Sequence, residues 1–96
     1  MSAYLIIDTD VHNPEAYEDY KAQVSPIIDR FGGTYLSRGG EITPVQTELW
    51  FPTRMVIVEF PSRAQAEAFL DSPDYAPIKA IRLASAHCNV ILVDGL

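Results

Sequence analysis

The sequence contains a single cysteine, Cys88, so the chain forms no internal disulfide. A lone cysteine suits the reducing environment of the cytoplasm, where we expect the protein to reside. The two histidines, His12 and His87, have no second histidine or cysteine at the spacing of a metal site. His87 precedes Cys88 directly, and neighbours in a strand point to opposite faces, which argues against a catalytic Cys–His pair. His87 is interpreted as a surface histidine rather than a haem ligand, and we expect no metal and no cofactor.

Basic residues are also scarce. Seven lysines and arginines stand against 13 aspartates and glutamates, a net charge of −6. Such a chain is repelled by nucleic acid and by anionic membranes, and we expect neither as a partner. No apolar run approaches the ~18 residues of a membrane span. The N-terminal segment MSAYLIID has no basic start and is interrupted by Asp8, so it does not resemble a signal peptide.

The remaining composition, 48% apolar and 21% charged, is that of one globular domain over residues 1–96. β-Branched and aromatic residues predict strands over 3–11, 34–40, 50–60 and 88–95. A first helix is predicted over 14–31, after the N-cap Asn13. A second begins after Ser62, breaks at Pro73 and resumes to Ala86. The order β-α-β-β-α-β predicts an α+β, ferredoxin-like fold with an antiparallel four-stranded sheet.

The strands are apolar on both faces, although the predicted fold supplies helices to one face alone. In the last strand, Val90 and Leu92 alternate with Ile91 and Val93. A bare apolar sheet face is larger than a monomer usually exposes, and a second copy of the sheet would cover it. The pattern therefore predicts a homodimer joined through its sheets.

Several segments occur in an order typical of one family. They are NPEAYEDY, GGTYLSRGG, ELWFPTR, VIVEFPS, SPDYAPIKAIR and VILVDG. Together they resemble the Domain of Unknown Function 1330 family (DUF1330) over nearly the whole chain. Phe69 and Asp94 depart from the family, which tends to have Trp or Tyr and Glu there. The resemblance implies a dimeric α/β-barrel built from ferredoxin-like protomers, and it implies no activity.

The stretch SRGGEI, residues 37–42, raises the question of a phosphate-binding loop. Its glycines are adjacent, no Lys-Ser/Thr pair follows, and the next predicted element is a strand. Nucleotide binding by such a loop is therefore rejected. Gly39 and Gly40 are interpreted as a bulge or bend that leads into a long hairpin.

Two arginines lie in otherwise apolar strands. Alternation places Arg38 on the face of Leu36, and Arg54 on the face of Val56. Each is a candidate anchor for an anionic ligand. The structural alternatives are an extended side chain that reaches solvent, or an ion pair with Asp8 or Glu59 on the neighbouring strands.

Tyrosines on the sheet-facing stripe of the first helix, Tyr17 and Tyr20, either pack in the core or offer hydroxyls to a cavity. The ligand-binding candidates are Arg38, Arg54, Tyr17, Tyr20, Asp8 and Trp50. No catalytic residue is assigned.

Three functions remain open. The first is binding of a small carboxylate or aromatic molecule between helices and sheet. The second is a cofactor-independent oxygenase or isomerase, in which a tyrosine, an arginine and Asp8 stabilise an enolate. The third is a non-catalytic interaction or structural module. A polar cavity favours ligand binding, and a cleft filled by Phe31, Phe69 and Tyr75 favours the interaction module.

Overall fold

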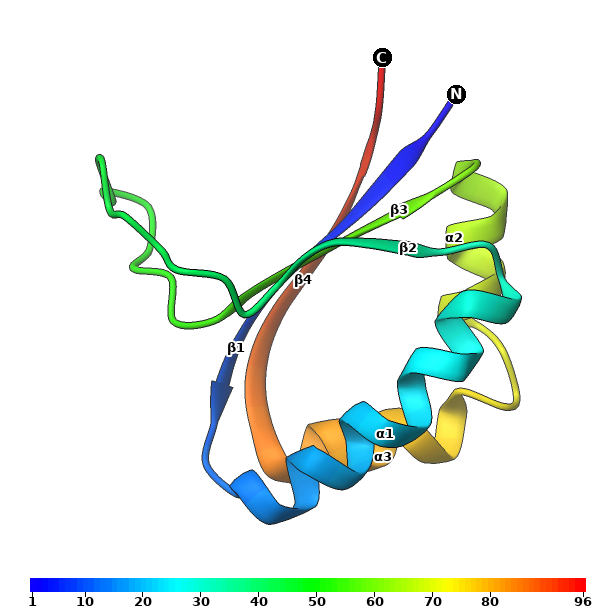
Figure 1. Ribbon diagram of the computed structural model, residues 1–96, viewed down its shortest axis with the longest axis horizontal. Helices are drawn as coiled ribbons and strands as arrows, with labels where there is room; N and C mark the ends of the chain where they lie inside the picture. Colours follow the sequence, from blue (N-terminus) through cyan, green and yellow to red (C-terminus); the bar gives the residue numbers. More distant parts are fainter.

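A computed structural model describes all 96 residues and contains one antiparallel four-stranded sheet with three helices on one side (Figure 1). The elements in chain order are β1 (Ala3–Val11), α1 (Pro14–Arg30), β2 (Thr34–Arg38), β3 (Met55–Phe60), α2 (Arg63–Leu70), α3 (Ala76–Ser85) and β4 (Ala86–Asp94). The strand order β2-β3-β1-β4 confirms the predicted ferredoxin-like fold. No helix is both long enough and apolar enough to cross a membrane.

The helices begin where their capping residues predict. The Asn13 side chain accepts a hydrogen bond from the Ala16 amide at 3.2 Å, and Pro14 occupies the first turn of α1. The Ser62 hydroxyl accepts a hydrogen bond from the Gln65 amide at the same distance and caps the N-terminus of α2. α2 ends at Leu70, and the following turn, which contains Pro73, separates it from α3.

Two predicted strands are shorter in the structure than in the sequence analysis. β2 ends at Arg38 and β3 begins at Met55, so the prediction of a strand over residues 50–54 is wrong. Residues 39–54 instead form a long loop that extends away from the helices, at the left of Figure 1. Gly39, Gly40, Pro44 and Pro52 explain this change, because glycine and proline interrupt strand pairing.

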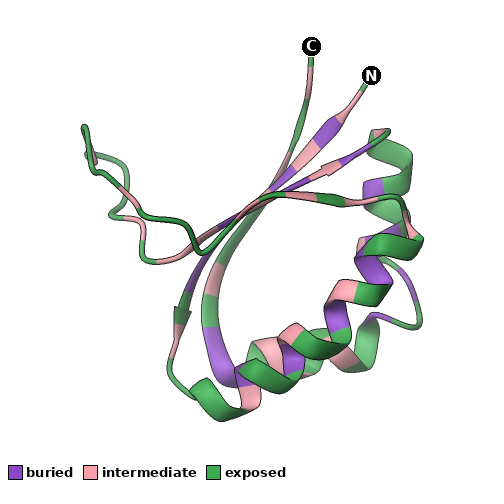
Figure 2. Ribbon diagram, in the orientation of Figure 1, coloured by how far each residue is buried: buried purple, intermediate pink, exposed green.

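The core lies between the helices and the sheet face that they cover, which we call the inner face. Figure 2 shows buried residues on the helices and on the strands of the sheet, and none on the loop at the left. Tyr17, Val24 and Ile28 of α1 are buried against strand residues such as Leu5 and Val58. Burial of side chains of this size contributes about 1.5–3 kcal/mol each, which makes this layer the main source of stability.

The opposite, outer face is apolar and carries no helix. Ile6 lies directly opposite Ile57 on one neighbouring strand and Ile91 on the other. Ile91 is 52% exposed and Val93 is 45% exposed. Both sheet faces are therefore apolar, as the alternation predicts, and one of them faces solvent in the isolated chain.

Candidate anion-binding site

A small cavity of about 30 Å³ lies between α1, α3 and the inner face of the sheet. Four basic residues and three tyrosines line it, together with apolar side chains. They are Lys21, Arg38, Arg54, Arg82, Tyr17, Tyr20, Tyr35, Ile7, Val24, Ile28 and Val56. Four of the seven basic residues of this acidic chain therefore surround one cavity.

Arg38 reaches this cavity because of an irregularity in β2. The pairing of β2 with β3 runs from Tyr35↔Val58 to Arg38↔Val56, with a shift between Tyr35 and Ser37. A bulge of this kind reverses the alternation of the residues that follow. The prediction that Arg38 shares the face of Leu36 is therefore wrong. Arg38 lies on the face of Tyr35, with its guanidinium carbon 4.8 Å from the centre of that ring.

Arg54 lies on the predicted face and contacts a tyrosine of α1. Its Nη1 lies 3.4 Å from the Tyr17 hydroxyl, to which it donates, and its guanidinium carbon lies 5.6 Å from the ring centre. Gly39 leaves room for this guanidinium, because an added Cβ would lie 3.2 Å from its nitrogens. Gly39 also has φ of +70°, a conformation that glycine adopts readily. The bend predicted at the adjacent glycines is therefore located at Gly39. The bulge in the strand lies before it, between Tyr35 and Ser37.

Asp8 forms no ion pair with either arginine. Its carboxylate is buried, and it accepts hydrogen bonds from the backbone amides of Thr53 at 2.8 Å and Arg54 at 3.1 Å. It also accepts one from Trp50 Nε1 at 2.9 Å. We call this arrangement the Asp8 latch. Asp8 alternates with the cavity residue Ile7, so its carboxylate does not line the cavity.

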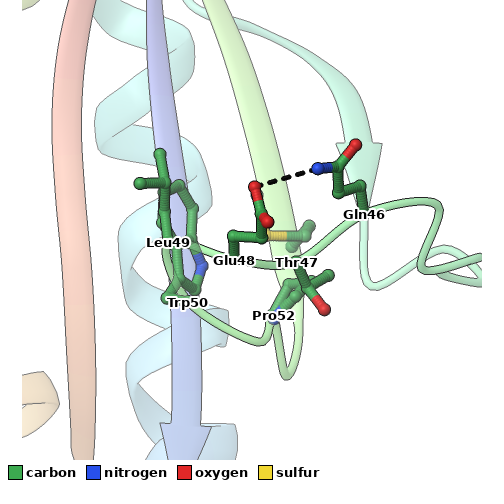
Figure 3. A pocket seen from close by; sticks show the side chains of 7 residues that line it. Gln46, Thr47, Glu48, Leu49, Trp50 and Pro52 are labelled. Atoms are coloured by element: carbon green, nitrogen blue, oxygen red, sulfur yellow. Dashed lines mark hydrogen bonds between the residues drawn. The ribbon is translucent and has the colours of Figure 1, made fainter.

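Trp50 also lies away from the cavity. It is 44% exposed and borders a separate pocket of about 430 Å³ formed by residues 46–50, Pro52 and Met55 (Figure 3). The Gln46 amide donates to Glu48 at 2.9 Å beside it, the dashed line of Figure 3. The candidate residues thus divide between two places, with Arg38, Arg54, Tyr17 and Tyr20 at the cavity and Asp8 and Trp50 at the base of the loop.

Arg82, on α3, was missed by sequence reasoning. It lies on a helix, whereas the pattern that marks Arg38 and Arg54 is a cation in an apolar strand. The available signal was its position four residues after Ile78 on the apolar stripe of α3. Burial acts to lower the pKa of the Arg82 guanidinium, but the Cys88 thiol and the hydroxyls of Tyr75 and Tyr20 favour its charged form and raise the pKa overall.

The tyrosine hydroxyls at the cavity are linked to the aromatic core. Tyr20 and Tyr75 hydroxyls lie 3.0 Å apart. Burial, aided by Tyr75 and opposed by Arg82, raises the pKa of Tyr20 far above its ordinary value. Tyr20 therefore keeps its proton near neutral pH and is not a tyrosinate base. Beyond Tyr75 the space is filled, since the ring of Phe69 lies 4.4 Å from that of Tyr75 and 6.2 Å from that of Phe31.

No carboxylate neutralises the three arginines. The ion pairs of the molecule are Lys21–Glu18, Arg30–Asp74, Arg63–Glu67 and Arg63–Asp94, and none includes Arg38, Arg54 or Arg82. No aspartate, glutamate, histidine or cysteine lines the cavity. The site can therefore attract and hold negative charge, but it contains no ordinary general base.

The histidines lie apart from this site. Both are exposed, and their rings lie 5.1 Å apart, His12 before α1 and His87 on β4. The molecule contains no group of three histidine, cysteine, aspartate or glutamate side chains placed to hold a metal ion. The Cys88 thiol instead contacts the Thr9 hydroxyl at 3.4 Å.

The fold and the site define a ferredoxin-like protein with an arginine- and tyrosine-lined cavity under its helices. Within that class, the family model named Domain of unknown function (DUF1330) matches residues 2–96, and the chain belongs to this family. The resemblance in sequence is thereby confirmed. A comparison with curated proteins finds no match.

Solved structures share the fold at low sequence identity. A protein of unknown function from Rhodopseudomonas palustris has a TM-score of 0.79 at 20% identity, covering 99% of this chain and 82% of its own. A dimeric ferredoxin-like protein of unknown function from Jannaschia sp. has 0.76 at 13% identity, covering 99% and 100%. SnoaB, a cofactor-independent oxygenase from Streptomyces nogalater, has 0.71 at 14% identity, covering 99% and 93%.

Proposed function

We propose that the protein is a cytoplasmic small-molecule binding protein that holds an anionic ligand, with a carboxylate as the simplest head group, in the cavity. The observation that carries this proposal is the set of three arginines, each placed against tyrosine and none paired with an acid. Arg54 and Arg82 are partly buried. A partly buried cation without an acidic partner is costly, and a bound carboxylate offsets that cost. Arginine and tyrosine donors also match the acceptor oxygens of such a ligand.

The cavity admits a head group and not a whole drug-sized molecule. Its volume of about 30 Å³ corresponds to the space of two or three water molecules. Arg38 is an exposed residue at its rim, so the remainder of a ligand would leave the cavity beside this side chain. The apolar residues Ile7, Val24 and Val56 suit a ligand that is partly hydrocarbon.

Substitution of Arg54 by Met tests this proposal. The variant keeps the apolar stem and removes the charge, so affinity for propionate or benzoate should fall at least about tenfold, as expected for loss of a charge-assisted hydrogen bond. Stability should be unchanged or slightly higher, because no acid is left unpaired. Isothermal titration calorimetry and thermal unfolding measure the two quantities.

Arg30→Met is the matched control, because Arg30 is an exposed arginine of α1 that pairs with Asp74 away from the cavity. It should bind like the parent. Equal affinities for Arg54→Met and the parent, or no carboxylate binding by the parent, would contradict the proposal. The second result would favour the non-catalytic interaction module.

We further propose that the protein is a homodimer, as in a dimeric α/β-barrel, with the outer faces of the two sheets packed together. The exposed apolar residues of β4 and the uncovered centre of the sheet support this arrangement. The Jannaschia protein, similar in fold over the whole chain, is described as dimeric.

A cofactor-independent oxygenase is the second candidate, supported by the similarity in fold to SnoaB and by the concentration of positive charge that would stabilise an enolate. An isomerase is less well supported, because Asp8 does not line the cavity and no other carboxylate replaces it. Oxygen uptake during incubation with polyphenolic aromatics, absent in Arg54→Met, would favour the oxygenase over simple binding.

A further inference from the structure

We propose that the cavity selects a compact group with two negative charges, such as a phosphate monoester, over a group with one. This inference rests on the proposed function and names the class of ligand that the same site would prefer. It differs from nucleotide binding by a glycine-rich loop, because the contacts come from side chains and not from backbone amides.

The first argument for a preference for two negative charges is the charge balance of the cavity. Arg38, Arg54 and Arg82 form no ion pairs, and no acidic side chain lines the cavity. Lys21, the fourth basic residue, already pairs with Glu18 at 2.8 Å. One carboxylate would leave two of the three guanidinium charges without a partner. A phosphate monoester, with a charge of about −1.5 to −2 near neutral pH, would balance most of them.

The second argument, which concerns the shape of the ligand, is the placement of the arginines. Arg38 and Arg54 come from the sheet layer, and Arg82 comes from α3 in the helical layer. A flat carboxylate has two oxygens, whereas a phosphate monoester has three terminal oxygens that diverge from one atom. The tetrahedral group therefore suits donors that approach from both layers, and arginine forms paired hydrogen bonds with phosphate readily.

The tyrosines restrict how far these arginines can move. Arg38 lies over the ring of Tyr35, and Arg54 over the ring of Tyr17. Such cation–π contacts stabilise a guanidinium and favour this position before a ligand arrives. The small volume of about 30 Å³ then favours two charges on one compact group over two carboxylates at the ends of an extended chain.

A matched ligand series tests charge and shape separately. Phenyl phosphate is a tetrahedral dianion at about pH 8, since the second phosphate pKa is about 6. Benzenesulfonate has the same shape with one charge, and benzoate is a planar monoanion. Calorimetry at fixed ionic strength should find phenyl phosphate bound at least about tenfold more tightly than both others. The preference should largely disappear at about pH 5, where the phosphate carries one charge.

Arg82→Met should reduce the phosphate preference, whereas Arg30→Met, with its altered charge outside the cavity, should keep it. Equal affinity for the three ligands would overturn the dianion inference and leave the proposed function standing. Tighter binding of both tetrahedral ligands than of benzoate, without a difference between them, would overturn it too, because shape and not charge would then decide. Binding of none of the three would overturn both proposals.

Discussion

Replacement of Asp8 by Ala is expected to lower the free energy of unfolding by about 3 kcal/mol, one of the largest effects available in this chain. The change removes three hydrogen bonds, from Thr53 N, Arg54 N and Trp50 Nε1, that end on one buried carboxylate. Each is a bond to a charged acceptor, the stronger class of hydrogen bond in proteins. Urea unfolding, followed by the fluorescence of the single tryptophan, measures the loss.

Two variants distinguish the Asp8 latch from a general effect of charge. Asp10→Ala removes a carboxylate from an exposed position of the same strand and should change stability by less than about 0.5 kcal/mol. Asp8→Asn keeps one acceptor for the backbone amides but turns an NH₂ group toward Trp50 Nε1, so its loss should be intermediate. A stability of Asp8→Ala equal to that of Asp10→Ala would show that the latch contributes nothing.

Replacement of Ile91 by Glu is expected to convert the proposed homodimer into a monomer at micromolar concentration. Ile91 is exposed on the outer face of the edge strand β4, opposite Ile6 of β1, and a charge there would be buried without a partner in a sheet-to-sheet interface. Sedimentation should find twice the 10.7 kDa chain mass for the parent and the single mass for the variant.

Leu83→Glu is the control for this experiment. Leu83 is 62% exposed on α3, in the helical layer and away from the outer face, so this variant should remain a dimer. A monomeric parent would overturn the proposed association, and a dimeric Ile91→Glu variant would place the interface elsewhere.

The strands and helices could be predicted because their signals are local. β-Branched and aromatic residues predict β1, and Asn13 and Ser62 mark helix starts through bonds within one turn. The site could be predicted in part. The alternation of β3 extends back to Arg54, so the predicted sheet face of Arg54 is correct. The bulge near Leu36 places Arg38 on the face opposite to the predicted one.

The remaining contacts depend on distant partners. The hydrogen bonds to Asp8 come from residues more than 40 positions away, and no pattern within β1 predicts them. Arg82 meets the cavity because α3 packs beside α1. Cations on helices and cations on strands come together only when the helical layer packs on the sheet. The spacing of residues within one segment therefore does not predict that they line the same cavity.

The Asp8 latch has a consequence for thermodynamic linkage between the two sides of the sheet. Trp50 and Arg54 are four residues apart, and both are held by the same carboxylate, the first through its indole and the second through its backbone. The Arg54 side chain extends to the cavity, whereas Trp50 lies at the loop pocket of Figure 3. We therefore expect a ligand that holds Arg54 in place to favour the bonded position of Trp50, and a contact on Trp50 to favour the ligand by the same coupling free energy.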